Sequence, residues 1–200
     1  MDMGGKYPER GPWLLVTASS AGATDSLRVT IWRKLRSLGA LYLQQSVCVL
    51  PARPDVEREI RRLVDRVRAN GGTARVLRIT FEDADEEAQL ASELQAARDD
   101  EYGEVLERVP AFLAELRSER DRDRATYEEV EESDADLERF RAWLAKIDRR
   151  DYFGAPRRQE AHVAVEGCAR ALEAFESEAF ARDARSGQER PPLRAIEDDA

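Results

Sequence analysis

The sequence contains few of the residues from which most metal and catalytic sites are built. Its 200 residues include two cysteines, one histidine and two methionines. A transition-metal site needs several histidine, cysteine or clustered carboxylate ligands that converge on one point. The stretch Glu160-Ala-His162 does not have the Glu-x-x-His spacing that a di-metal centre in a helical bundle requires. We therefore expect no metal site and no cofactor.

The motifs of the standard enzyme classes are also missing. No serine or cysteine nucleophile can be paired with His162 from the sequence. No glycine-rich phosphate loop is present, and Ala21-Gly22-Ala23 is only a weak candidate for an anion site. The two cysteines form no CxxC pair. Cys168 lies in a helical stripe with Val165 and Leu172, which indicates a core thiol, and the strand position of Cys48 favours packing. These features predict a protein that is not an enzyme.

Long apolar runs are absent as well. The run from Trp13 to Ala18 is too short for the apolar region of a signal peptide, and no stretch approaches the ~20 residues of a membrane span. The cysteines offer no disulfide framework, which is typical of proteins from a reducing compartment. The prediction is a cytoplasmic protein without a membrane partner.

Charge is what the sequence has in excess. Charged residues make up 36% of the chain, against about 25% in average proteins. Residues 1–80 hold 14 Lys/Arg and 7 Asp/Glu, whereas residues 81–200 hold 18 Lys/Arg and 34 Asp/Glu. Such an asymmetry indicates contact with a polyanion through the first half alone, although an unevenly charged solvated surface explains it equally well.

The first half has the pattern of an α+β domain. Strand signals cover residues 13–19, 41–50 and 73–81, and the middle one reads as two short strands or one bent strand. Helical spacing covers the stretch from Thr24 or Asp25 to Leu38, before Gly39, and the stretch from Asp55 to Asn70. The order β-α-β(β)-α-β contains two crossovers, which predicts a ferredoxin-like sheet with both helices on one face.

The second half has the pattern of an antiparallel helical bundle. Helices are predicted from Ala84 towards Leu116, with a kink or break at Pro110, from a cap at Thr126 to Ile147, and over residues 157–180. Trp143 lies on or beside the apolar seam of the middle helix and is interpreted as structural. The predicted organisation is a basic ferredoxin-like domain (1–82), an acidic helical domain (83–180) and a mobile tail (181–200).

Arginine is the remaining candidate for a functional site. The guanidinium fork matches phosphate and other tetrahedral oxyanions. We predict that the basic side chains of the two N-terminal helices bind DNA or an oxyanion; they are Arg28, Arg33, Lys34, Arg36, Arg58, Arg61 and Arg62. The alternative is a solvated helix face that pairs with the acidic residues of the second half.

Several segments resemble the N-terminal domain of ChrB-type chromate resistance proteins. The segments are residues 32–51, Tyr127 through Leu137, Arg141–Ile147, Arg150–Gly154 and Ala171–Phe175. The first half also resembles the ferredoxin-like domains of phenylacetate-type repressors and of small CRISPR adaptation nucleases. Those nucleases bind metal through an aspartate at the end of the first strand, where this chain has residues 17–20 without an acid, so nuclease activity is not expected.

The resemblance implies a regulator or sensor of chromate resistance. Such a protein would bind DNA as a homodimer, control a chromate efflux operon and respond to chromate. Longer members of the family continue into a second, C-terminal domain beyond the stretch that matches Ala200. We expect either that this domain is a separate protein or that the chain is a free-standing homologue with a changed role. The alternative is an accessory or protein-interaction module of chromate or oxyanion detoxification that does not bind DNA.

Overall fold

The structure of the chain is a computed structural model that describes residues 11–20, 25–122 and 127–188. The described residues form two compact units. One contains the residues up to Gly103 together with Ala145–Arg158, and the other contains Glu104–Leu144 and the residues from Gln159 onward. The elements are β1 (Trp13–Ser19), α1 (Asp25–Ser37), β2 (Leu41–Gln44), β3 (Val47–Pro51), α2 (Pro54–Ala69), β4 (Thr73–Ile79), α3 (Ala84–Asp121), α4 (Tyr127–Asp148) and α5 (Arg158–Gln188).

The first unit is built on a four-stranded antiparallel sheet in the order β2-β3-β1-β4. The central strand β1 pairs on both sides, so that Val16 lies between Cys48 and Val76. Two crossovers through α1 and α2 generate this order, which confirms the predicted ferredoxin-like arrangement. The segment 41–50 proves to be two strands, β2 and β3, joined by a turn at Gln45 and Ser46.

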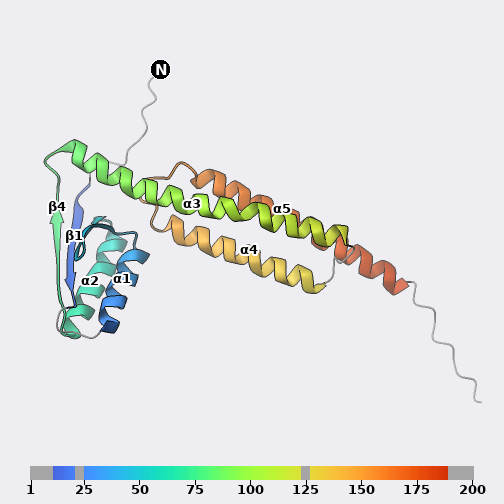
Figure 1. The fold of residues 1–200 in the computed structure, drawn as a ribbon, viewed down its shortest axis with the longest axis horizontal. Coiled ribbons are helices and arrows are strands. Elements are labelled where there is room, and N and C mark those ends of the chain that lie inside the picture. The colour runs from blue at the N-terminus through green and yellow to red at the C-terminus, as the bar shows by residue number, and fades with distance from the viewer. Residues whose placement is uncertain (1–10, 21–24, 123–126, 189–200) are drawn as a thin grey trace, which may run out of the picture. The chain divides into compact units, whose positions relative to one another are not determined.

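Both helices cover one face of the sheet (Figure 1). Alternate residues of a strand point to opposite faces, and Leu14 and Val16 of β1 reach a core that Leu27, Ile31 and Leu35 of α1 share. Helix α2 contributes its own apolar stripe to the same core: Val56, Ile60, Leu63, Val64 and Val67. Because these stripes are committed to the sheet, the basic residues of both helices emerge on their outer faces and flanks.

The opposite face of the sheet is covered in part by the beginning of α3. Trp13, Val49 and Leu94 form a second buried cluster, to which Leu90 and Phe153 add. The Trp13 ring stacks on Phe153 at 5.7 Å between centroids, and its indole Nε1 donates a hydrogen bond to Glu87 at 3.0 Å. The first turns of α3 and the loop after α4 therefore complete the sheet domain.

The helices of the second half are longer and more continuous than predicted. Helix α3 runs from Ala84 to Asp121 with Pro110 inside it, so the expected break is wrong. A proline removes one backbone hydrogen bond from a helix; here the buried Val109 and Phe112 pack on either side of an exposed Pro110 and hold the backbone helical. Helix α5 continues to Gln188, beyond the predicted end at residue 180.

The second unit is a helical bundle with an apolar centre. Helix α4 runs opposite to α3 and α5 (Figure 1). Phe112 and Phe140 meet edge to face at 5.9 Å, and Cys168 and Phe175 of α5 are fully buried. Trp143 is half-buried, with the guanidinium of Arg108 5.1 Å from the ring centroid. The predicted cap at Thr126 lies outside the described residues.

Candidate nucleic-acid interface

The seven basic residues singled out from the sequence lie on two neighbouring helices. Arg28, Arg33, Lys34 and Arg36 belong to α1, and Arg58, Arg61 and Arg62 belong to α2. All are exposed except Lys34, which is half-buried. The two helices together carry nine Lys/Arg against five Asp/Glu, and they share one side of the sheet. The cations are thus in excess on this layer, which suits a polyanion.

One group of these cations lies between the two helices. The Lys34 ammonium donates a hydrogen bond to the Glu59 carboxylate, and Arg62 donates to the other oxygen of Glu59 at 2.7 Å. The hydrogen bond from Lys34 lowers the pKa of Glu59, and the charges of Lys34 and Arg62 add to this effect. Two cations therefore share one carboxylate, and the group retains a net positive charge.

A second group lies towards strand β4. Glu57 pairs with Arg61 at 3.4 Å and also with Arg78 of β4. Beside it is a hollow of about 620 Å³, lined by Arg61, Arg68 and Arg75 among others. Arg68 is held there by hydrogen bonds from its guanidinium to the Ala74 carbonyl, at 2.9 and 3.3 Å. The carboxylates that pair with the α2 cations are thus on α2 itself.

A third group lies towards strand β2. Arg28 lines a groove of about 760 Å³ between α1 and the β2–β3 turn, together with Trp32 and Tyr42. The Arg36 guanidinium lies 5.2 Å from the centroid of the Trp32 ring. Among the described residues, Arg28, Arg33, Arg36 and Arg58 have no ion-pair partner. The structure therefore brings the predicted residues onto one layer but divides them among three places.

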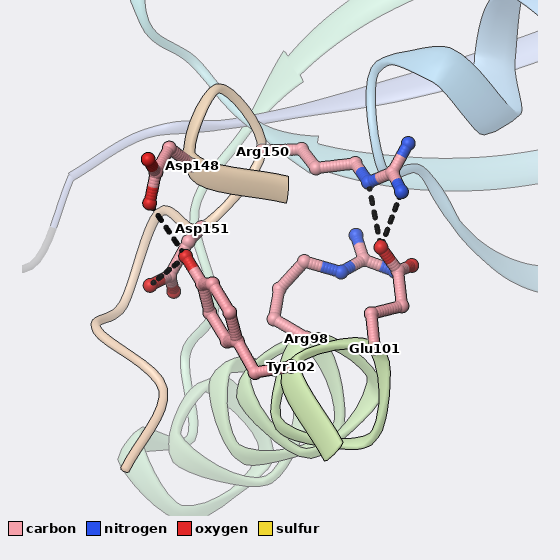
Figure 2. Close-up of polar contacts among 6 residues, drawn as sticks. All are labelled: Arg98, Glu101, Tyr102, Asp148, Arg150 and Asp151. Atoms are coloured by element: carbon pink, nitrogen blue, oxygen red, sulfur yellow. Dashed lines mark hydrogen bonds and ion pairs between the residues drawn. The ribbon is translucent and has the colours of Figure 1, made fainter. Parts of the chain in front are cut away.

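A polar cluster around Arg98 (Figure 2) lies beside Gly39, which follows α1. Glu101 of α3 accepts a hydrogen bond from Arg150 and forms an ion pair with Arg98 at 2.8 Å. Arg98 is 9% exposed, and its Nε and Nη1 find no hydrogen-bond partner among the described residues. Burial lowers the pKa of Arg98, the neighbouring Arg150 lowers it further, and Glu101 opposes both effects.

Two tyrosines tie the loop after α4 to the rest of the unit. Tyr152 donates a hydrogen bond to the carbonyl of Leu38 at 2.7 Å, and burial raises its pKa to about 12. Tyr102 is buried and donates to Asp148 at 2.7 Å, also lying 3.4 Å from Asp151 (Figure 2). Burial and the bond to Asp148 raise the pKa of Tyr102. Both phenols therefore stay protonated. Tyr152 anchors the loop to Leu38, just after α1, and Tyr102 anchors it to α3.

Sequence reasoning missed the aromatic groove and the buried cluster. The spacing of Arg28, Trp32 and Arg36 at i, i+4 and i+8 was a usable signal, because such residues share one side of a helix. Nothing in the sequence distinguishes Arg98 and Arg150 from the other charged residues of an acidic region; in the fold Arg98 is buried and Arg150 is half-buried.

The described residues offer little for metal or thiol chemistry. Within residues 11–20, 25–122 and 127–188 no three His, Cys, Asp or Glu side chains gather as metal ligands. Both cysteines are buried, and burial raises the pKa of Cys48 to about 12 and raises that of Cys168. Across the same part of the chain, no helix is long and apolar enough to cross a membrane.

Comparison with family models gives a match over most of the chain. A family model with the description "Protein ChrB, N-terminal" matches residues 28–186, which begin within α1, leave out β1 and end within the last turn of α5. Neither the curated proteins nor the solved structures contain a match to the chain.

Proposed function

The chain belongs to the ChrB N-terminal family, which associates it with chromate resistance, and on that premise we propose that it is a non-catalytic transcriptional regulator that binds DNA through the outer face of α1 and α2. The observation that carries the proposal is the surplus of cationic side chains on these two helices, nine Lys/Arg against five Asp/Glu. Cations that neutralise phosphates supply most sequence-independent affinity for DNA.

The arginines without carboxylate partners support this assignment most directly. Arg33 and Arg58 are exposed and have no ion pair among the described residues. A guanidinium that is not already paired gives up no internal contact when it binds a phosphate, and it can do so through two hydrogen bonds. Chromate, itself a tetrahedral oxyanion, would compete for such groups, and we include it in the proposal as the effector of a homodimeric regulator.

The test is a titration of duplex DNA from the promoter of the chain's own gene at two salt concentrations. The variant Arg33→Ala/Arg58→Ala removes two unpaired cations, and Arg117→Ala/Arg170→Ala, with two exposed arginines of the second unit, is the matched control. We expect weaker binding at low salt and a salt slope flatter by about 0.9 for each phosphate that the variant no longer neutralises. Chromate should weaken binding of the parent more than sulfate does.

The result also decides the second candidate, an accessory or protein-interaction module that does not bind DNA. Its support is a set of exposed apolar side chains beside the basic face: Val29, Trp32, Tyr42 and Leu43. A parent protein that binds no DNA even at low salt refutes the regulator and leaves this candidate. A control variant that weakens binding as much as Arg33→Ala/Arg58→Ala refutes the assigned face.

A further inference from the structure

We propose that the groove between α1 and the edge strand β2 binds one unstacked nucleotide of a DNA strand, with the Trp32 ring as the stacking surface and Arg28 as a phosphate contact. The inference rests on the proposed function, which it extends from backbone contact to contact with a base. It concerns residues of the first unit alone.

The groove has the size and lining of a ligand site. Its volume of about 760 Å³ lies within the range of small-molecule pockets, roughly 300–1,000 Å³. Trp32 and Tyr42 supply aromatic surface, and Gln44, Gln45 and Ser46 supply amide and hydroxyl groups that can hydrogen-bond to a base edge. The sites that bind single-stranded nucleic acid combine the same two elements, aromatic rings and a cationic groove.

The exposure of the aromatic rings needs an explanation that packing does not supply. Trp32 is 48% exposed and Tyr42 is 38% exposed, and Val29 beside them is 43% exposed. Scattered apolar residues are normal on a surface, but a group that shares one hollow marks an interaction site. Arg36 lies over the Trp32 ring, and planar guanidinium and indole groups are the surfaces on which splayed-out bases stack.

The charge around the groove selects an anionic occupant. The lining residues include the cation Arg28 and, among the described residues, no carboxylate. Arg28 and Arg36 are eight residues apart on one side of α1, which places their Cα atoms about 12 Å apart with Trp32 between them. A strand that stacks a base on the face of Trp32 opposite Arg36 therefore finds a cation for the phosphate on either side.

Continuity with the basic face favours nucleic acid over a peptide. The exposed Arg33 lies about 100° around α1 from Trp32, so a strand leaving the groove meets a cation of the surface proposed to hold the DNA backbone. Taking a base out of a duplex requires a few kcal/mol of unstacking and unpairing, and less at a mismatch or in a single strand. The groove thus predicts a preference for single-stranded or mismatched DNA over a fully paired duplex.

The experiment uses the full chain with three probes: single-stranded oligo(dT), a paired duplex, and the same duplex with one mismatch. Trp32→Ala should weaken the affinity for oligo(dT) about 5- to 150-fold, as expected when one base no longer stacks on an aromatic ring. Trp32→Phe should retain most of the affinity. Because Trp32 is exposed, thermal melting should show that Trp32→Ala still folds.

Fluorescence gives an independent readout. Trp13 is 2% exposed, so in a Trp143→Phe background iodide reaches only Trp32, and oligo(dT) should abolish this quenching. If oligo(dT) binds but leaves iodide quenching unchanged, and Trp32→Ala binds it with unchanged affinity, the nucleotide site in the groove is refuted while the proposed function stands. Binding of no probe overturns both. Protection of Trp32 that rises with protein concentration in the absence of DNA assigns the groove to a second copy of the chain and overturns the proposal.

Discussion

The substitution Gly39→Ala tests whether the buried arginine cluster fixes the end of α1. Gly39 follows α1 with φ +69°, a conformation that favours glycine. A Cβ atom at this position would lie 2.5 Å from Nη1 of Arg98 and 3.0 Å from Cβ of Arg150. Alanine therefore introduces both backbone strain and a steric clash, and Arg98 cannot withdraw freely because its Nη2 is paired with Glu101 at 2.8 Å.

A second glycine separates the two effects. Gly71 has φ +79°, and a Cβ there would meet nothing within 4 Å. Gly71→Ala should lower the free energy of unfolding only by the backbone term, about 1–2 kcal/mol. Gly39→Ala carries the same term and an overpacking term of about 1–3 kcal/mol. The difference between the two variants measures the clash with the arginine cluster.

Urea denaturation followed by the fluorescence of the buried Trp13 reports on the first unit, in a background where Trp32 and Trp143 are phenylalanine. Each kcal/mol should also shift the melting temperature by about 2–4 °C in a chain of this size. The double variant Gly39→Ala/Arg98→Ala should lose less free energy of unfolding than the two single variants lose together. Equal destabilisation by the two glycine variants, or an additive double variant, refutes the reasoning.

Two further substitutions follow from burial and from helix geometry. Burial raises the pKa of the Cys48 thiol from 9.0 to about 12, so the folded state keeps this proton to a higher pH than the unfolded state, and the free energy of unfolding should fall as the pH rises from about 9 towards 12. In denaturation at several pH values, Cys48→Val should reduce this loss of stability. Native protein that reacts with a thiol reagent at pH 8 as fast as unfolded protein contradicts the burial of Cys48. Pro110→Ala restores a backbone donor within α3 at an exposed position and should raise the free energy of unfolding by about 1–3 kcal/mol. Pro54→Ala, at the start of α2, is its control and should bring no gain, because a proline in the first turn removes no helical hydrogen bond; a loss of stability in Pro110→Ala would show that the helix has adapted its packing to the ring.

The sequence by itself determined the ferredoxin-like order of the first half. Strand β1 is an apolar run bounded by turn residues, and α2 repeats its apolar residues at helical spacing, so both were predictable from local pattern. Gly39 was likewise predictable as the residue that ends α1, since only glycine adopts its φ of +69° without strain. Local periodicity also fixed which side of α1 faces the core, and hence that its arginines point outward.

Tertiary structure alone decided how far the helices extend and how the cations are grouped. Pro110 reads as a helix breaker, yet packing of Val109 and Phe112 keeps α3 continuous, because burial of two apolar side chains outweighs one missing hydrogen bond. The sequence does not show which of the seven predicted basic residues pair with a carboxylate. Glu59 pairs with Lys34, 25 residues away, and β2 approaches Trp32, and these two contacts distinguish a partly neutralised group from an accessible groove. Such contacts join chain segments that no local pattern brings together.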